Sequence, residues 1–473
     1  MHIHFMGIGG TAMGSVAVAA SQIGHRVTGS DHAVYEPMRG VLDRHGIVWT
    51  EYADGSDLVL SAPDLVIVGN AISRGHPELE AVLDARIPIA SVSEFVGQHF
   101  IARNTGIVCS GTHGKTTTAS LTTWILQHAG FEPGFLIGGV PHGFTNGCRP
   151  VPSATHNTRT GVFVAEGDEY DTAFFDKRSK FVHYRPNVAI INNIEFDHAD
   201  IFDSLDSIKK SFVQLTRLVP RSGLILVNAD DADALNVTHH VFCPVQSVGI
   251  APSATWQITN IVANPDGSQW YLRSESAILG PFALPMAGEH NIRNASMALL
   301  AAMHVGVTGE ECILALEHFV PPKRRMEKIC VWKGAMVIDD FAHHPTAIRA
   351  TLQAVQQQFP TAAIHAIFEP RSNTTTRNIF QDELAECFTG AATVVIGPVH
   401  RPERFKPSER LNTNQLISDL AARGINGYAL TEATDSWGSS VIPWLETHVT
   451  PGDVVLLLSN GNVGGLRSIL ASA

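Results

Sequence analysis

A glycine-rich stretch with one lysine, CSGTHGKTTT at residues 109–118, has the composition of a phosphate-binding loop. Such a turn exposes backbone N–H groups to an anion, and the helix that follows adds its positive end. Lys115 would reach the terminal phosphates and Thr116 would ligate magnesium. The usual spacing, G-x-x-x-x-G-K-[ST], needs glycine where Cys109 stands, whereas the early glycine here is Gly111. The stretch therefore predicts a particular subclass of nucleotide site; a glycine turn that only caps a strand is the alternative.

A second glycine turn, GIGGTA at residues 7–12, satisfies G-x-G-x-x-[GA]. Asp31 falls at the end of the next predicted strand, where a dinucleotide-binding fold places the residue that contacts the ribose. Taken alone, this pattern predicts an NAD-dependent oxidoreductase. The same geometry would hold any diphosphate, including that of a nucleotide sugar, and tight packing of helix on strand is the alternative without a ligand.

Two groups of polar residues, mostly acidic, follow predicted strands in the middle of the chain. They are Glu166, Asp168, Glu169 and Asp171 after GVFVA, and Glu195, Asp197, His198 and Asp200 after NVAIINN. The carboxyl ends of adjacent parallel strands meet at the edge where such sheets bind ligands, so both groups are expected beside the phosphate loop. Hard divalent ions take oxygen ligands and keep several waters, so one or two of these residues would hold magnesium against ATP. For single members such as Asp197, helix capping is the alternative.

Two further polar groups stand where predicted elements start or end. One is GEHNIRNA, with His290, Asn291 and Asn294, and the other is DDFAHHP, with Asp339, Asp340, His343 and His344. Helix capping explains such positions as well as ligand binding does. Paired histidines also suggest zinc, but no third ligand stands at a useful spacing, so we expect no zinc site.

The elements that must position these residues are short apolar runs bounded by glycine, which alternate with amphipathic segments of helix length. This pattern predicts βαβ units and parallel sheets. Since 473 residues exceed what one hydrophobic core can hold, we expect three α/β domains. They are a Rossmann-like domain at 1–104, a central P-loop ATPase-like domain at 105–320 and a Rossmann-like domain at 321–473. Alternation around Asp266 and Gly267 predicts a hairpin, and with it an antiparallel addition to the central domain.

Bulk composition limits the partners that the chain can have. With 44% hydrophobic and 16% charged residues it is a folded chain, and it lacks an apolar run long enough to cross a membrane. A net charge of -12 disfavours nucleic acid and anionic membranes as partners. The first residues lack the features of an export signal, so a cytoplasmic location is expected. Six cysteines without C-x-x-C spacing argue for reduced thiols.

The ordered set GTHGKTTT, EGDEYD, NNIEFDHAD, GEHNIRNA, KRRME and DDFAHHP resembles the Mur ligases, the ATP-dependent enzymes that form amide bonds in peptidoglycan synthesis. The resemblance extends from HFMGIGGTAMGS near the start to SNGNVGG near the end. It implies ATP and Mg2+ as cofactors and an acyl phosphate as the intermediate. It also implies that the first glycine turn binds a UDP-sugar rather than a nicotinamide.

The resemblance implies a role for each matching residue. Lys115, Glu166 and His198 would be catalytic, and Thr116, Glu166 and His198 would hold metal. The ATP site would comprise Gly111, Thr112, His113, Gly114, Lys115, Thr116, Thr117, Asn291, Arg325 and one aspartate of the pair Asp339 and Asp340; related motifs carry one or two, so the choice stays open. The UDP-sugar would contact Gly9, Gly10, Thr11, Asp31 and Asn70. Arg371, Ser372 and Asn373 are candidate peptide contacts, because a basic residue suits a substrate rich in carboxylates; surface loops with ordinary ion pairs are the alternative. Several family members have a lysine that becomes carbamylated where this chain has Phe212, so no carbamate is expected.

Within the family, stretches such as DEYDTAFFDKRSKFVHY and EPRSNT most resemble the members that join UDP-N-acetylmuramate to L-alanyl-γ-D-glutamyl-meso-diaminopimelate in peptidoglycan recycling. Members that add L-alanine are the main alternative, and they usually have serine where this chain has Tyr170. An NAD-dependent oxidoreductase and a nucleotide-regulated binding module are alternatives from other classes. Asp176, Lys177 and Arg178 are further candidates for peptide contacts. We expect a monomer or weak homo-oligomer that closes about linkers between its domains.

Overall fold

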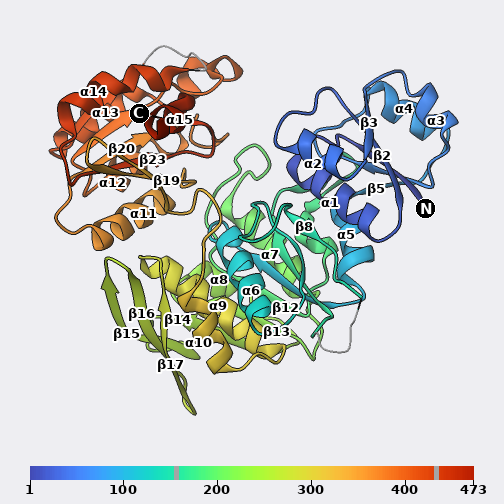
Figure 1. Cartoon of the computed structure of the whole chain (residues 1–473), viewed down its shortest axis with the longest axis horizontal. Helices are drawn as coiled ribbons and strands as arrows, with labels where there is room; N and C mark the ends of the chain where they lie inside the picture. The colour runs from blue at the N-terminus through green and yellow to red at the C-terminus, as the bar shows by residue number, and fades with distance from the viewer. Residues whose placement is uncertain (154–158, 431–435, 473) are drawn as a thin grey trace.

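The computed structural model describes residues 1–153, 159–430 and 436–472. Figure 1 shows three α/β units along the chain, coloured from blue through green to red. Among these residues, the N-terminal sheet has five strands, the central sheet ten and the C-terminal sheet six. The predicted fold class, three α/β domains with an antiparallel addition to the central sheet, is confirmed. The boundaries predicted after residues 104 and 320 stay a prediction.

The N-terminal unit alternates strands and helices around a parallel sheet of order β3-β2-β1-β4-β5. Its elements are β1 (His2–Met6), α1 (Thr11–Gln22), β2 (Arg26–Asp31), α2 (Met38–Arg44), β3 (Val48–Glu51), α3 (Ser56–Leu60), β4 (Leu65–Val68), α4 (Pro77–Asp84), β5 (Ile89–Ser91), α5 (Val92–Val96) and a π-helix (Gly97–Ile101). Strand β1 lies at the centre, and Ile3 and Phe5 are fully buried in it. The glycine turn predicted at residues 7–12 lies between β1 and α1.

The central unit has a ten-stranded sheet of order β17-β16-β15-β14-β13-β12-β6-β9-β7-β8. Its strands are β6 (Thr105–Ser110), β7 (Gly134–Leu136), β8 (Cys148–Arg149), β9 (Val162–Gly167), β12 (Val188–Ile191), β13 (Leu224–Asn228), β14 (Val245–Gly249), β15 (Trp256–Asn264), β16 (Gly267–Arg273) and β17 (Ile278–Leu284). The helices are α6 (Lys115–His128), α7 (Leu205–Thr216), α8 (Ala232–Asn236), α9 (Glu289–His304) and α10 (Gly309–Glu317), and β10 (Asp171–Ala173) with β11 (Asp176–Ser179) forms a separate hairpin. The predicted hairpin at Asp266 and Gly267 joins β15 to β16, where Asn264 pairs with Gly267.

The C-terminal unit has a six-stranded sheet of order β18-β19-β23-β20-β21-β22, parallel except for β18. Its elements are β18 (Glu327–Trp332), β19 (Ala335–Asp340), α11 (Pro345–Gln358), β20 (Ile364–Phe368), α12 (Gln381–Cys387), β21 (Thr393–Ile396), α13 (Thr413–Ala422), β22 (Asn426–Ala429), α14 (Ile442–His448), β23 (Val454–Leu458) and α15 (Leu466–Ser472). Strand β23 is the last in sequence but lies between β19 and β20, and every residue in it is buried.

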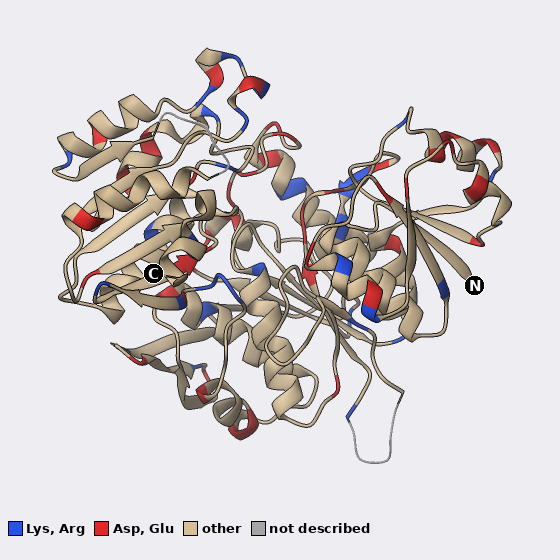
Figure 2. Ribbon diagram, turned by 45° about the horizontal axis from the view of Figure 1, so that its top comes forward, with Lys and Arg blue, Asp and Glu red and all other residues tan. Residues whose placement is uncertain are grey.

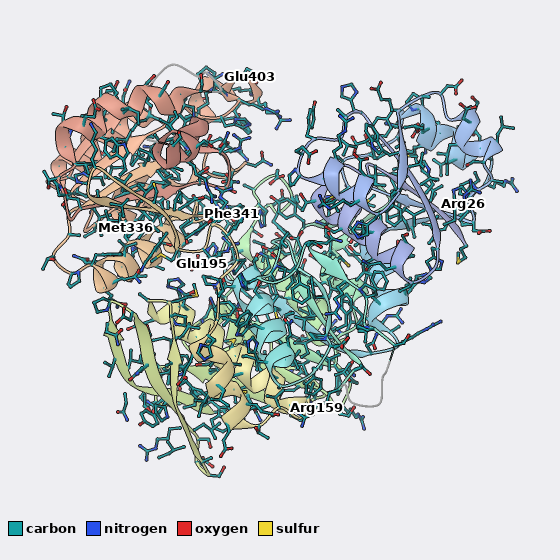
Figure 3. The ribbon with its side chains drawn as sticks, viewed as in Figure 1. Arg26, Arg159, Glu195, Met336, Phe341 and Glu403 are labelled. Atoms are coloured by element: carbon teal, nitrogen blue, oxygen red, sulfur yellow. The ribbon has the colours of Figure 1, made fainter. Side chains whose placement is uncertain are left out.

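Apolar strands form the core of each unit, and charged residues gather elsewhere. Figure 2 shows acidic and basic residues mainly on the helices and loops around the sheets. Figure 3 places Glu195 and Phe341 where the central and C-terminal units meet, and Arg26 on the N-terminal unit. Within the part of the chain that the structure describes, every helix is too short or too polar to cross a membrane.

Candidate active site

The phosphate loop connects β6 to α6 and needs glycine at two positions. Gly111 has a φ of +136°, and a Cβ atom there would lie 2.9 Å from the Cβ of Asn192. Gly114, the N-cap of α6, has a φ of +83°, and a Cβ there would lie 2.7 Å from Oδ1 of Asn294. The loop is therefore packed between the end of β12 and helix α9, and only residues without a side chain fit at these points.

Lys115 points back into this loop. Its Nζ donates to the carbonyl oxygens of Gly111 (2.8 Å) and Thr112 (3.1 Å) and to both carboxylate oxygens of Glu169, at 3.0 and 2.9 Å. Burial alone would lower the pKa of Lys115, but the charge and hydrogen bond of Glu169 together with the charges of Asp168 and Glu166 raise the pKa above its ordinary value. The ammonium group is thus charged and held in place by a buried anion.

Glu169 is the residue around which this part of the site is organised. It is 1% exposed, and besides Lys115 it contacts Nε2 of His198 at 3.0 Å. Burial lowers the pKa of His198, but the hydrogen bond to Glu169 and the charge of that carboxylate raise it above the ordinary value. The sequence placed Glu169 in an acidic group but assigned it no role; its two contacts come from residues 54 and 29 positions away.

The other two predicted metal ligands, Thr116 and Glu166, contact each other rather than Glu169. Oγ1 of Thr116 donates to Oε1 of Glu166 at 2.9 Å, and the N–H of Gly138 donates to Oε2 of the same carboxylate at 2.7 Å. Tyr170, which follows Glu169, lies with its ring centroid 4.1 Å from that of His198. Thr116 and Glu166 therefore form one pair of predicted metal ligands, whereas His198 is bound to Glu169.

His113, inside the phosphate loop, belongs to a second polar group that reaches the C-terminal unit. Its Nε2 lies 3.1 Å from Oε2 of Glu195, and Nδ1 of His344 lies 3.4 Å from the same oxygen. Burial lowers the pKa of His344 to about 4, so its imidazole is neutral at pH 7. The sequence showed no third ligand for a metal near His344, yet these three donor atoms lie within 4.8 Å of one another, in a combination that zinc accepts.

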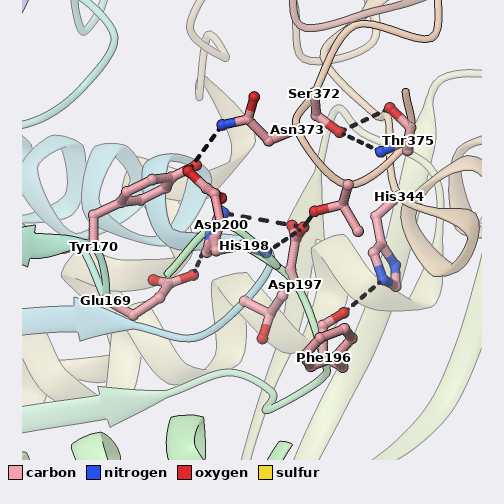
Figure 4. Close-up of polar contacts among 12 residues, drawn as sticks. Glu169, Tyr170, Phe196, Asp197, His198, Asp200, His344, Ser372, Asn373 and Thr375 are labelled. Atoms are coloured by element: carbon pink, nitrogen blue, oxygen red, sulfur yellow. Dashed lines mark hydrogen bonds and ion pairs between the residues drawn. The ribbon is translucent and has the colours of Figure 1, made fainter. Parts of the chain in front are cut away.

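The segment after β12 makes further contacts with the C-terminal unit (Figure 4). Oγ1 of Thr374 donates to Oδ1 of Asp197 at 2.6 Å, and Nδ2 of Asn373 donates to Oδ2 of Asp200 at 2.8 Å. Nε2 of His344 lies 3.3 Å from the carbonyl oxygen of Phe196. Residues that follow a central strand are therefore bonded directly to the loop after β20 and to the N-cap residue of α11.

The remaining residues predicted for the nucleotide lie at the junction of the central and C-terminal units. Asn291 is buried, and its side chain donates to the carbonyl oxygen of Ala287 at 2.8 Å. Oδ1 of Asp340 accepts from the N–H of Ala342 at 2.9 Å, and the guanidinium carbon of Arg325 lies 4.9 Å from the centroid of the Phe341 ring.

Asp339 differs from its neighbour Asp340. Its Oδ2 pairs with Arg467 at 2.7 Å and Arg324 at 3.3 Å, and its other carboxylate oxygen is buried with no partner among the described residues.

Two further residues predicted for ATP lie near Lys115. Thr112 is buried in the phosphate loop, and Thr117 is buried in the first turn of α6.

The first glycine turn is held by its own aspartate. Oδ2 of Asp31 accepts the N–H of Gly9, and its Oδ1 accepts the N–H of His32, both at 2.7 Å. Gly10 is the N-cap of α1, which begins at Thr11. Asn70 is the predicted sugar contact farthest from the turn in the sequence, and its side chain donates to Asp171 of the central unit at 3.1 Å. The turn, the aspartate and the helix start are thus together, with Asn70 at the contact between units.

The predicted peptide contacts lie on the loop after β20, where their side chains already have partners. Nη1 of Arg371 lies 3.4 Å from Oε1 of Glu369, and Oγ of Ser372 lies 2.7 Å from Oγ1 of Thr375. Asn373 bonds to Asp200 as described above.

The second set of peptide candidates lies in another part of the molecule. On strand β11, Nε and Nη2 of Arg178 donate to the two carboxylate oxygens of Asp176, at 3.0 and 2.7 Å. Lys177 pairs with Asp171 at 2.7 Å.

Phe212, where several family members have a lysine, is fully buried, and its ring centroid lies 5.3 Å from that of Phe181.

The residues present fit a nucleoside triphosphate and a hard divalent cation. Two glycines without side chains and one charged lysine form a cradle for phosphate, and the hydroxyl of Thr116 with the carboxylate of Glu166 offers two oxygen ligands on one side of it. The carbonyl Oδ1 of Asn192, next to the loop, is buried with no partner among the described residues. A site of this composition can bind phosphate groups and stabilise their transfer.

Comparisons with known proteins agree with this geometry over almost the whole chain. Residues 2–104 match the family described as "Mur ligase family, catalytic domain", residues 109–302 match "Mur ligase middle domain" and residues 324–461 match "Mur ligase, glutamate ligase domain". The UDP-N-acetylmuramate–L-alanyl-γ-D-glutamyl-meso-2,6-diaminoheptandioate ligase of Escherichia coli (strain K12) is 40% identical over 99% of this chain and 97% of its own. The ligase of the same name from Haemophilus influenzae is 38% identical over 98% of this chain and 97% of its own.

Solved structures give the same result. The crystal structure of a murein peptide ligase from Psychrobacter arcticus 273-4 has a TM-score of 0.70 and 36% identity, and covers 100% of this chain and 98% of that one. The UDP-N-acetylmuramate–alanine ligase of Thermotoga maritima has a TM-score of 0.75 over 100% of this chain and 98% of its own, and at 22% identity it supports the fold alone. The chain therefore belongs to the Mur ligase family, whose members are ATP-dependent ligases that form amide bonds.

Proposed function

We propose that this chain joins UDP-N-acetylmuramate to the tripeptide L-alanyl-γ-D-glutamyl-meso-diaminopimelate, with ATP as the energy source, in peptidoglycan recycling. Two relatives that carry this activity in their names match nearly the full chain at 40% and 38% identity, above the 31% of a relative named as a UDP-N-acetylmuramate–L-alanine ligase. The structural observation that carries the proposal is the phosphate loop, whose Lys115 is linked through Glu169 and His198 to a loop of the C-terminal unit. A nucleotide and an amine could thus meet at one place.

The reaction needs activation because a carboxylate is a poor electrophile. Transfer of the γ-phosphoryl group of ATP to the muramyl carboxylate forms an acyl phosphate and ADP, and the free amine of the peptide then displaces phosphate to form the amide. Lys115 and the N–H groups of the loop would stabilise the charge on the transferring group. Bound Mg2+ would supply further charge neutralisation, and Thr116, Glu166 and His198 would hold it. No nucleophile of the protein is needed for this chemistry.

The residues of the site take the following roles in this proposal. Lys115, Glu166 and His198 are catalytic; Gly111, Thr112, His113, Gly114, Thr116, Thr117, Asn291, Arg325, Asp339 and Asp340 bind ATP; Gly9, Gly10, Thr11, Asp31 and Asn70 bind the UDP-sugar; Arg371, Ser372 and Asn373 bind the peptide. We add Glu169 as the residue that positions Lys115 and His198. The units act as a domain for the UDP-sugar (1–104), one for ATP (105–320) and one for the amine (321–473), and the ATP and UDP-sugar substrates suit a cytoplasmic enzyme.

The comparisons favour a ligase over the oxidoreductase alternative, because the three matched family models and both full-length relatives are ligases. The contacts of Asp31 with the N–H groups of Gly9 and His32 shape the turn and suit a diphosphate of either kind. The L-alanine ligase alternative shares the phosphate chemistry and differs only in the amine.

A coupled assay of ADP release tests the proposal. We expect ADP formation that depends on UDP-N-acetylmuramate, Mg2+ and an amine together, with the tripeptide a far better substrate than L-alanine. Faster turnover with L-alanine would replace the proposal by the alanine-adding activity. Reduction or oxidation of a nicotinamide without any dependence on ATP would replace it by a different class.

A further inference from the structure

One continuous chain of hydrogen bonds links the loop of the C-terminal unit to the lysine of the phosphate loop. Oγ1 of Thr374 donates to Oδ1 of Asp197 at 2.6 Å, and the same oxygen accepts the N–H of His198 at 2.7 Å. Nε2 of His198 lies 3.0 Å from Glu169, which pairs with Lys115 at 2.9 Å. Only the first of these contacts crosses between units. The C-terminal loop is thus four bonds from the group that would hold the phosphates.

Three members of this chain are buried, and the side chains of Lys115 and His198 are each 14% exposed, so water is largely excluded from the contacts. Thr374 and Glu169 are 1% exposed and Asp197 is 4% exposed. Hydrogen bonds that involve a charged group gain strength where water is excluded, and an unpaired polar group there is costly. Displacement of Thr374 would leave Asp197 with one partner fewer next to His198.

His198 itself is held in an unusual conformation. Its φ is +55°, a region that residues with a side chain rarely adopt, and its carbonyl oxygen accepts from Ile201 at 2.9 Å and Phe202 at 3.0 Å. A backbone in this region persists only where neighbouring groups fix it. Asp197, which binds the N–H of His198, is one of those groups, and Thr374 in turn orients Asp197.

The loop that carries Thr374 is also the loop of the predicted peptide contacts. Oγ of Ser372 accepts the N–H of Thr375 at 3.1 Å, and Thr374, Thr375 and Thr376 are all buried, so the loop is internally fixed. Asn373 adds a second bond between the units, to Asp200 at 2.8 Å. A shift of this loop would therefore move both contacts at once.

We propose that Thr374 and Asp197 are positioning residues for phosphoryl transfer: the hydroxyl from the C-terminal unit sets Asp197, and through it His198, Glu169 and Lys115 at the phosphate loop. The ATP site then reaches its reactive geometry only while the loop after β20 is docked on the segment after β12. This inference rests on the proposed function for its kinetic consequence, and on the hydrogen bonds alone for its consequence in nucleotide binding. Neither residue touches ATP in it.

The test uses the full chain with Thr374→Val, which keeps the shape of the side chain and removes the hydroxyl. The first readout is the affinity of a fluorescent ATP analogue, and the second is the burst of ADP on rapid mixing with ATP and UDP-N-acetylmuramate without an amine. Loss of one hydrogen bond to a charged group should lower the affinity for the analogue and the rate of the ADP burst by about tenfold each. Thr374→Ser, which keeps the hydroxyl, should restore both values to within about twofold.

Thr376→Val is the matched control. This threonine is 2% exposed in the same loop, but its hydroxyl donates to the carbonyl oxygen of Ser372 at 2.9 Å, inside the loop. Thr376→Val should change the thermal stability but leave the affinity for the ATP analogue and the rate of the ADP burst unaltered. Addition of Thr374→Val to Asp197→Ala should cause no further loss, because both substitutions break the same link.

Equal effects of Thr374→Val and Thr376→Val, or additive effects of the Thr374 and Asp197 substitutions, would overturn the proposal and reduce the contact to packing between domains. Absence of any ADP burst in the unaltered protein would count against the proposed reaction instead. In that case the comparison of analogue affinities still decides the role of Thr374.

Discussion

Glu169→Gln tests whether the site is organised around one buried anion. The substitution keeps the shape of the side chain and removes the charge that pairs with Lys115 at 2.9 Å and with His198 at 3.0 Å. Because Glu169 is 1% exposed, Lys115 and His198 would lose the buried anion that they share. Breaking a buried ion pair by removal of one partner costs about 3–5 kcal/mol, and we expect a loss of that size in the central domain.

The matched control is Glu132→Gln, the same change at the surface. Glu132 pairs with Arg149 at 3.1 Å, but its side chain is 42% exposed, and a pair of this kind contributes about 0–1 kcal/mol. The assay is hydrogen exchange at pH 7, followed by mass spectrometry on peptides from α6, which begins at Lys115. This readout reports the opening free energy of the central domain separately from that of the other two.

Lys115→Met should cost less than Glu169→Gln, because His198 remains to pair with the carboxylate, and the hydrogen bond and charge of Glu169 raise the pKa of His198. The double variant Lys115→Met, Glu169→Gln should recover part of the stability that Glu169→Gln loses, since Lys115 is then no longer left as an unpaired charge. If Glu169→Gln costs no more than Glu132→Gln, the reasoning fails and the carboxylate is not the centre of the network.

Four shorter predictions concern individual features. Lys115→Ala should abolish ADP formation while the far-UV circular dichroism stays the same, and unchanged turnover would remove the lysine from the mechanism. Gly114→Ala should lower the affinity for a fluorescent ATP analogue by about tenfold or more, since the added Cβ would lie 2.7 Å from Oδ1 of Asn294 at a φ of +83°. Equal affinity would mean that the loop is not packed as described. Removal of Mg2+ with EDTA should stop ADP release until the ion is restored, and activity with EDTA present would contradict the metal assignment. Burial lowers the pKa of His4 to about 4, so the unfolded chain binds the proton first as the pH falls. The free energy of unfolding should therefore drop by about 3 kcal/mol between pH 6.5 and 4. His4→Gln should flatten this slope in urea titrations, and an unaltered slope would count against a buried neutral imidazole.

Local features of the chain could be predicted from the sequence because their causes are local. A strand followed by glycines and Lys115 gives a phosphate loop at the start of a helix, and Asp266-Gly267 between alternating segments gives a hairpin. The order of apolar runs and helices gives parallel sheets for the same reason.

The partners of each side chain could not be predicted, because they depend on which strands become neighbours. Four acidic residues stand within six positions from Glu166 to Asp171, and no pattern distinguishes the one that meets Thr116 from the one that meets Lys115. The sheet order β12-β6-β9 decides this, since it places the loops after all three strands side by side. His344 shows the same limit: its neighbours His113 and Glu195 lie on another domain, far away in sequence.

The central claim is that the site converts a carboxylate into an acyl phosphate before the amide forms. UDP-N-acetylmuramate labelled with heavy oxygen in the lactyl carboxylate tests it directly, by mass spectrometry of the phosphate released with ATP and the tripeptide. The account predicts that one labelled oxygen from the carboxylate appears in each phosphate released. Phosphate without label, alongside formation of the amide, would contradict it.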